Sequence, residues 1–222
     1  NADIFIWDLA IILIMAFSLS GGFACSIWVK RHPDQSFQKH FVGFLGFLGF
    51  FGFLVITYAS FIEPQIIVVT KAALSHPLAQ PLKIVVISDT HVGPYKGAKF
   101  LERVVQDVNN LLPDIVVMPG DFVFTRSADL KDLAPLANIN APLGVYAVLG
   151  NHDVGQYLSP SGARYSGKDR GDNIAKTLES FSVQVLRNEH TVLELTHGSI
   201  AIAGIDDLWT GHHDLPASMS GI

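Results

Sequence analysis

Three short polar motifs in this sequence combine the residue types that bind divalent metal ions. They are Asp89-Thr90-His91, Gly120-Asp121 and Gly150-Asn151-His152-Asp153. Carboxylate oxygens, imidazole nitrogens and an amide oxygen suit Mn, Zn, Fe or Mg, and one carboxylate can bridge two such ions. Each motif alone is weak, because Asp and Asn are also common in turns and helix caps. Together they predict a two-metal site for phosphoryl chemistry.

Each of these motifs directly follows a predicted buried strand, and helices are predicted between the strands. Strands are predicted at residues 82–88, 114–118 and 145–149, and helices at residues 100–112, 128–139 and 173–181. The alternation of strands with helices of three- and four-residue apolar spacing predicts an α/β domain. In such sheets the ligand crevice lies at the carboxyl ends of the strands, so we expect the three motifs to meet at one rim.

The later part of the chain has a different pattern. Residues 183–186, 192–195 and 200–205 are three β-rich runs in close succession, with a turn at His197-Gly198, and they predict antiparallel hairpins. A Gly/Ser-rich segment precedes the third helix and carries three cations, Arg164, Lys168 and Arg170. Charged loops are usually solvated, so we predict that these cations face solvent and do not bind a phosphate group.

Two long stretches near the start of the chain contain no charged side chain. They are residues 9–29 and 41–62, each long enough to cross a hydrocarbon core of about 30 Å as a helix. A hydrophobic fraction of 49% with 16% charged residues is also too apolar for an ordinary soluble domain. A secretory signal peptide is the competing interpretation of the first stretch, but that stretch is too long and a second follows at once. We predict a membrane anchor at residues 1–62.

The second stretch and the loop before it carry further patterns. Gly43, Gly46, Gly49 and Gly52 recur every three residues, which predicts close helix packing without the four-residue dimer motif. The loop between the stretches holds three cations and one acidic residue, and short loops rich in Lys and Arg stay in the cytoplasm. The domain after the anchor is therefore expected outside the cytoplasm. We predict a linker and first strand at residues 63–81.

The ordered series of DTH, GD and GNHD motifs resembles the calcineurin-like metallophosphoesterase family. With the two spans before it, the chain is similar to the membrane-anchored branch of that family, which includes bacterial cell-envelope phosphoesterases and UDP-2,3-diacylglucosamine pyrophosphatases. The segments Leu186-Arg187-Asn188-Glu189 and Ala203-Gly204-Ile205-Asp206-Asp207 also fit. The resemblance implies an incomplete four-layer α/β/β/α sandwich over residues 82–222, and a bacterial inner (plasma) membrane protein.

The resemblance also implies two divalent metal ions and four ligands for them. Asp89 and His91 would hold the first metal, Asp121 would bridge both, and Asn151 would hold the second. The bridging carboxylate would contact both cations, so its loss should matter most. The identity of the ions, Mn, Zn, Fe or Mg, stays open.

Two catalytic residues are implied as well, and part of the family pattern is missing. His152 would face the substrate phosphate, and Asp153 would orient His152 by a hydrogen bond. The pattern further calls for a later His and a Gly-His-x-His motif, which do not occur before Ile222. Thr196-His197-Gly198 and Gly211-His212-His213-Asp214 have the wrong spacing, so we do not assign them as ligands. We therefore expect the chain to be truncated at its carboxyl end.

These expectations lead to one principal function and one main alternative; a second alternative, a membrane scaffold whose α/β domain is only an interaction surface, leaves the three motifs unexplained. The principal hypothesis is an enzyme that hydrolyses a phosphate ester or pyrophosphate bond, with a phosphate-containing, lipid-linked substrate held near the membrane. The alternative is a non-catalytic membrane-anchored module that binds phosphate or a lipid headgroup. Nucleic acid is excluded as the main ligand, because the net charge of -5 falls entirely after residue 62 and no basic cluster occurs there. The single cysteine, Cys25, excludes an intrachain disulfide.

Overall fold

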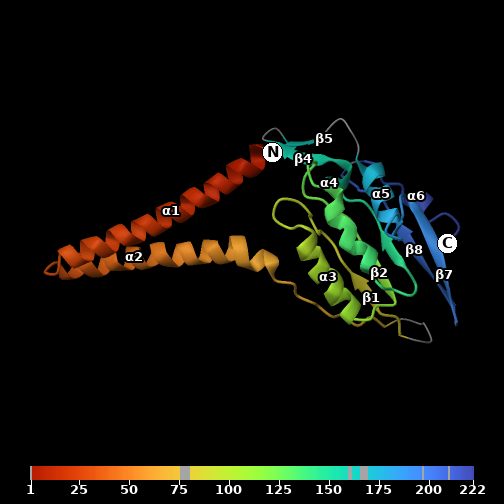
Figure 1. Cartoon of the computed structure of the whole chain (residues 1–222), viewed down its shortest axis with the longest axis horizontal. Helices are drawn as coiled ribbons and strands as arrows, with labels where there is room; N and C mark the ends of the chain where they lie inside the picture. The colour runs from red at the N-terminus through yellow and green to blue at the C-terminus, as the bar shows by residue number, and fades with distance from the viewer. Residues whose placement is uncertain (1, 76–80, 160–161, 166–169, 197, 210) are drawn as a thin grey trace. The chain divides into compact units, whose positions relative to one another are not determined.

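The protein divides into two compact units. The computed structural model describes residues 2–75, 81–159, 162–165, 170–196, 198–209 and 211–222. The first unit is Asn1–Lys71 and the second is Ala72–Ile222 (Figure 1). The division falls inside the segment predicted as a linker. The described residues from 66 to 75 have irregular backbone, so the strand predicted there is not formed by them.

A four-stranded parallel sheet lies at the centre of the second unit, with the strand order β1-β2-β3-β6. The strands are β1 (Ile84–Val86), β2 (Ile115–Met118), β3 (Val145–Ala147) and β6 (Gln184–Val185). The register pairs Ile84 with Ile115, Val116 with Val145, and Ala147 with Val185. Because all four strands are parallel, their carboxyl ends share one edge of the sheet. All four strands lie where strands were predicted, each shorter than expected. The prediction that residues 183–186 belong to an antiparallel hairpin is wrong, because β6 follows a helix (Gly171–Glu179) that provides the crossover of a parallel pair, and it pairs parallel with β3.

Helices cover one face of this sheet. They are α3 (Ala98–Asn110), the 3-10 helix η3 (Leu130–Asn138) and α5 (Gly171–Glu179). Helix α3 buries Leu101, Val105 and Val108, the face that its three- and four-residue spacing predicts. The predicted helix at 128–139 is a 3-10 helix instead, with Pro135 buried inside it. Proline has no amide proton to donate to the preceding turn, so an ordinary α-helix is disfavoured there.

An antiparallel hairpin covers the other face of the sheet. It comprises β7 (Glu189–Leu195) and β8 (Gly198–Gly204), paired from Glu189↔Gly204 to Leu195↔Gly198. Leu193, Ile200 and Ile202 of the hairpin pack against the buried Ile115, Tyr146 and Leu186. A one-turn helix, α6 (Leu215–Ser218), contacts β7. The layers helix, parallel sheet and antiparallel hairpin agree with the α/β/β part of the predicted sandwich (Figure 1).

A short helix and two short strands follow the third strand of the sheet. Helix α4 (Asn151–Val154) begins immediately after the loop at Gly150. Strands β4 (Gln156–Ser159) and β5 (Gly162–Tyr165) then pair antiparallel, for example Tyr157 with Arg164. The sequence predicted only a Gly/Ser-rich loop there, because strands of four residues leave little periodicity to detect.

The first unit is a helical hairpin of α1 (Ala2–Arg31) and α2 (Ser36–Thr57). Helix α2 continues through a π-helical turn, η1 (Tyr58–Ile62), into a 3-10 turn, η2 (Glu63–Gln65). The apolar helical stretches span 27 and 30 residues, long enough to cross a membrane. Only 6% of each apolar window is buried within the protein, unlike the core helix of a soluble domain. Length, composition and exposure all suit membrane spans.

The glycine repeat of α2 faces α1 within this hairpin. A Cβ atom added at Gly49 would lie 2.8 Å from the carbonyl oxygen of Ser18, and one added at Gly46 would lie 3.0 Å from the Cβ of Cys25. Gly22 of α1 lies opposite the same two glycines. Small residues allow two helix backbones to approach closely, so the predicted close packing is confirmed.

This packing predicts a specific disulfide with the single native cysteine. In Gly46→Cys the new Cβ lies close to Cys25, and a small relaxation reaches the Cβ separation of about 3.8 Å that disulfides prefer. Oxidation of the solubilised protein should therefore remove both free thiols, as measured by thiol counting. The control is Gly52→Cys, whose Cβ faces Ser18, about 10 Å along α1 from Cys25. Equal cross-linking in the two variants would contradict the helix register.

Candidate metal centre

The loops that follow β1 and β2 remain paired beyond the ends of the strands. The amide of Asp89 donates to the carbonyl of Gly120 at 3.2 Å, and the amide of His91 donates to the carbonyl of Asp121 at 3.0 Å. Val92 and Val123 then form an isolated parallel bridge. This irregular ladder places the first two polar motifs side by side at the carboxyl edge of the sheet, as the sequence predicts.

The backbone is left-handed at three of the four predicted metal ligands. The φ angles are 54° at Asp89, 45° at His91 and 56° at Asp121. Left-handed backbone is uncommon for residues with a side chain, and such strained conformations concentrate at functional sites. The turns end the regular strands early. Strained backbone at these positions is therefore an independent indication of a functional site.

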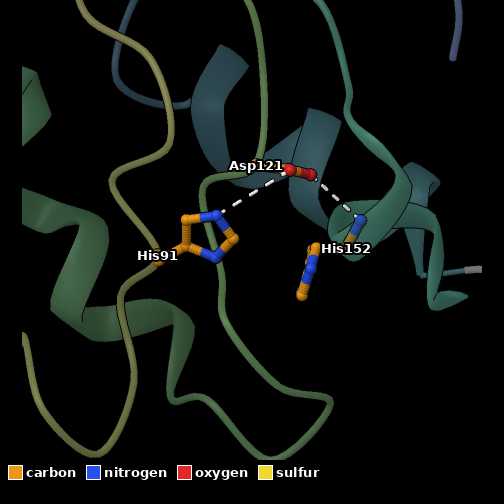
Figure 2. A group of neighbouring side chains, drawn as sticks. All are labelled: His91, Asp121 and His152. Atoms are coloured by element: carbon orange, nitrogen blue, oxygen red, sulfur yellow. Dashed lines mark hydrogen bonds and ion pairs between the residues drawn. The ribbon is translucent and has the colours of Figure 1, made fainter. Parts of the chain in front are cut away.

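The side chains at this edge form a compact group of donor atoms. His91 Nε2 lies 3.4 Å from Asp89 Oδ1 and 3.8 Å from Asp121 Oδ2. His91, Asp121 and His152 each place one ligand atom within 4.8 Å of the others (Figure 2). Two ligands about 2.1 Å from one metal with tetrahedral geometry lie about 3.4 Å apart. The donor set and its spacing therefore fit a divalent cation.

His91 has the properties of a neutral metal ligand. Burial and the neighbouring His152 lower the pKa of His91 and outweigh the opposing effect of Asp121 and Asp89. A lowered pKa leaves the imidazole neutral at pH 7, which is the form that binds metal. Its buried Nδ1 has no hydrogen-bond partner among the residues that the structure describes. An unpartnered ring nitrogen fits the neutral imidazole, because a protonated ring would have to satisfy two N–H donors.

Asp121 is held in place by backbone and by two glycines. Its Oδ1 accepts a hydrogen bond of 3.0 Å from the amide of His152, which leaves Oδ2 on the side of His91 (Figure 2). A Cβ atom at Gly150 would lie 2.2 Å from Asp121 Oδ1, and a Cβ at Gly120 would lie 2.4 Å from the Gly150 amide nitrogen. Only glycine allows this approach. The glycines of the GD and GNHD motifs thus bring the loops after β2 and β3 into contact.

Asp153 does not contact the His152 ring in the way that we predicted. Its carboxylate accepts hydrogen bonds from the amides of Gly150 and Asp121 at Oδ2, and from those of Phe122 and Val123 at Oδ1. Burial raises the pKa of Asp153 to about 7, although the amide donors favour the ionised form. The buried carboxylate therefore joins two loops, and its predicted hydrogen bond to His152 is wrong because backbone amides use its acceptor sites.

A backbone carbonyl orients the His152 ring instead. His152 Nδ1 lies 2.9 Å from the carbonyl oxygen of Phe124. Because a carbonyl only accepts, Nδ1 carries a proton and Nε2 is the atom left for a ligand. The ring lies 4.7 Å from the His91 ring, centroid to centroid, and stacks near the ring of Phe124. Phe124 is a site residue that the motifs did not indicate.

The remaining predicted residues lie at or near this edge. Asn151 is the first residue of α4 and is half-buried, and its role as a ligand stays a prediction. Ser88 donates its hydroxyl hydrogen bond to Asp89. Ser88 was not predicted, although its place directly before the first motif could have drawn attention to it.

Arg170 departs from the prediction that the charged loop is solvated. Its guanidinium is half-buried and donates to the carbonyls of Thr125 and Arg126 and, at 3.5 Å, of Ala128. Lys168 lies outside the described residues. Sequence spacing could not predict this contact, because every residue type has a backbone carbonyl.

The segments around 187 and 206 form a structural cluster. Arg187 Nη2 pairs with the buried Asp206 at 2.9 Å, and Arg187 Nη1 pairs with Asp172 at 2.8 Å. Asn188 Oδ1 accepts from the amides of Asp206 and Asp214. These contacts hold the loop after β8 against the start of β7 and explain why charged and amide residues recur there.

Comparison with known proteins agrees with this geometry. Residues 82–219 match the family described as calcineurin-like phosphoesterase. A transmembrane protein with metallophosphoesterase domain from Danio rerio is 36% identical over 131 residues, which cover 57% of this chain and 27% of that protein. An uncharacterized metallophosphoesterase from Bacillus subtilis is 31% identical over 172 residues, covering 73% of this chain and 56% of that protein.

A third relative has a more specific name. A UDP-2,3-diacylglucosamine pyrophosphatase from Chlamydia trachomatis is 35% identical over 112 residues, covering 48% of this chain and 34% of that protein. The matches thus span between 27% and 56% of the length of these three relatives. Because the family match covers the whole parallel sheet and all three polar motifs, this chain belongs to the calcineurin-like phosphoesterase family.

Proposed function

We propose that this chain carries the metal centre of a membrane-anchored hydrolase that cleaves a phosphate ester or a pyrophosphate bond. The observation that supports this most strongly is the convergence of His91, Asp121 and His152, with Asp89 beside them, at one edge of the sheet. Family membership supports the hydrolase class, and the donor set supports divalent metals. The alternative, a module that only binds phosphate, would show metal binding without turnover.

The metal ligands follow the roles that the family resemblance implies. Asp89 and His91 would hold one cation, Asp121 would contact two, and Asn151 would hold the second. The left-handed turns and the Asp121–His152 amide contact support these roles, because they fix the donors before any ion binds. When bound, divalent cations of the Mn, Zn, Fe or Mg kind would polarise the phosphoryl oxygens and activate water.

The protein's own residues bind and orient the substrate in this proposal. His152 holds one proton at Nδ1 against the Phe124 carbonyl, which leaves Nε2 to face the phosphoryl group in this proposal. With a second proton on Nε2, His152 would stabilise the transition state or protonate the leaving oxygen. Asp153 contributes through the loops that it joins. The aromatic ring of Phe124 stacks beside the His152 ring, with the centroids 5.9 Å apart.

The substrate is proposed to be a phosphate-containing lipid or a lipid-linked precursor. Two apolar helices, each long enough to span a bilayer, precede the domain and would hold the site near the membrane surface. One relative is named as a pyrophosphatase of UDP-2,3-diacylglucosamine, which carries acyl chains and a pyrophosphate. We place the protein in a bacterial inner membrane with residues 63–222 outside the cytoplasm.

A kinetic prediction compares the loss of Asp121, proposed to contact both cations, with the loss of Asn151, proposed to contact one. With Mn²⁺ and an aryl phosphate ester, Asp121→Asn should lower kcat/KM of the intact protein by at least about 100-fold, because cations contribute several kcal/mol to charge stabilisation. Asn151→Ala should lower it less, by about tenfold. Chelator should abolish the wild-type activity.

A matched carboxylate at the opposite edge of the sheet serves as control. Asp114 accepts a hydrogen bond from the amide of Lys83 before β1, so Asp114→Asn changes the same chemical group away from the metal centre. It should leave kcat/KM unchanged. Full activity in chelator, or equal losses in Asp114→Asn and Asp121→Asn, would refute the metal mechanism.

The second prediction uses the close approach at Gly150. In Gly150→Ala the new methyl group would displace the Asp121 carboxylate, so the affinity for Mn²⁺ should fall by about 10–100-fold in isothermal titration calorimetry. Gly97→Ala is the control, because its Cβ would meet only Asp132 Oδ2 at 3.8 Å, an ordinary contact. Unchanged Mn²⁺ affinity in Gly150→Ala would show that Asp121 is no ligand.

The third prediction concerns the side of the membrane on which the domain lies. Lys30, Arg31 and Lys39 lie at or between the ends of the two long helices, which favours a cytoplasmic loop there. A reporter that is active only outside the cytoplasm should therefore be active when fused after Thr70. Activity restricted to a cytoplasmic reporter at the same position would invert the topology.

A further inference from the structure

We propose that Arg170 is a positioning residue for His152 and acts through the loop of residues 124–128. This inference rests on the proposed function, because it concerns the same site. Arg170 lies about 20 residues after His152 in the sequence and outside the three polar motifs. Its connection to the site becomes visible only in the contacts of its guanidinium.

The Arg170 guanidinium is bound to one loop. Nη1 donates to the carbonyl of Thr125 at 3.2 Å and to the carbonyl of Arg126, and Nη2 lies 3.5 Å from the carbonyl of Ala128. A planar guanidinium has five donors in a fixed arrangement, so it can hold several carbonyls of one turn at once. Within the loop, the Ala128 amide donates to the Thr125 carbonyl at 3.1 Å, and the hydroxyls of Thr125 and Ser127 lie 3.1 Å apart.

The same loop carries the carbonyl that orients His152. Phe124, whose oxygen lies 2.9 Å from His152 Nδ1, directly precedes Thr125. The Phe124 oxygen and the Thr125 nitrogen belong to one planar peptide group, so the direction of the Phe124 carbonyl depends on how Thr125 is held. Because Arg170 holds the Thr125 carbonyl, it also restricts the position of the Phe124 carbonyl oxygen, which accepts the His152 Nδ1 proton.

Arg170 is itself anchored to a rigid element. Its backbone carbonyl accepts from the amides of Asn173 and Ile174 at 2.9 and 3.0 Å, at the start of α5. Helix α5 buries Ile174 and Leu178 in the main core. The loop next to the site is thus tied to a packed helix, as precise functional sites require.

Direct binding of the substrate phosphate is the competing role for the Arg170 guanidinium. Loss of a phosphate-binding cation raises KM, whereas loss of a positioning residue lowers kcat and acts through the group that it positions. The guanidinium donors are already directed at carbonyls, which favours the positioning role. The two roles are separable by kinetics.

The test uses the full chain in detergent with Mn²⁺ and an aryl phosphate ester. Arg170→Met should lower kcat about tenfold, in the range seen when the partner of a catalytic imidazole is lost, with KM changed less than about twofold. Arg170→Lys should recover most of the loss, because an ammonium also donates to the carbonyls. In a His152→Asn background, Arg170→Met should cause no further loss. A raised KM, or an additive loss in the double variant, would overturn the proposal.

A second readout does not depend on activity. In metal-free protein labelled with nitrogen-15 histidine, the His152 signals, identified by their loss in His152→Asn, should show the Nδ1–H tautomer in the wild type and a mixture in Arg170→Met. Lys83→Met is the matched control, because Lys83 Nζ donates to the Leu111 carbonyl at 2.8 Å at the other edge of the sheet. It should change neither kcat nor the tautomer.

The two readouts separate the inference from the proposed function. A tautomer shift in Arg170→Met, in a protein without phosphatase activity, would support the positioning role and refute the enzyme. An unchanged tautomer in Arg170→Met, with normal wild-type activity, would refute the positioning role alone.

Discussion

The buried carboxylate of Asp153 is the contact on which the metal centre depends. It accepts four backbone hydrogen bonds, from Gly150 in its own loop and from Asp121, Phe122 and Val123 in the loop after β2. Burying a carboxylate costs several kcal/mol, and hydrogen bonds to a charged group contribute about 1.5–3 kcal/mol each, so the four bonds offset much of the cost of burial. Burial raises the pKa of Asp153 to about 7, and a cation at Asp121 would favour its ionised form.

The rest of the site follows from the junction that Asp153 creates. With the two loops joined, the backbone of Gly150 lies against the Asp121 carboxylate, and the His152 amide reaches Asp121 Oδ1. The left-handed turns at His91 and Asp121 direct their side chains to the same point. The site is therefore shaped mainly by backbone contacts, which hold Asp121 at Oδ1 and His152 at Nδ1 and leave Asp121 Oδ2 and His152 Nε2 for a ligand.

Sequence patterns predicted the elements that depend on apolar periodicity. Helix α3 lies where Leu101, Val105 and Val108 recur at helical spacing, and the parallel strands lie where apolar runs precede the motifs. The placement of the motifs at one edge also followed, because parallel strands share their carboxyl ends.

Other features could not be predicted, because their partners are backbone atoms. The hydrogen-bond donor to the Asp153 carboxylate was expected to be His152. The donors are instead backbone amides, three of them about 30 residues earlier in the chain, and residue types do not show which amides are available. The roles of Phe124 and Arg170 could not be predicted either. Phe124 contacts His152 through its own backbone carbonyl, and Arg170 donates to the backbone carbonyl of Thr125. The 3-10 geometry of η3 reflects Pro135, which interrupts a pattern that otherwise predicts an α-helix.

The proposed function requires that a divalent cation bind between the loops after β1, β2 and β3. Anomalous X-ray scattering from crystals of the Zn²⁺-loaded protein would locate that cation. We expect a peak about 2.1 Å from His91 Nε2 and from a carboxylate oxygen of Asp89 or Asp121. A strong peak elsewhere, for instance at the exposed His212 and His213, with none between His91 and Asp121, would contradict it.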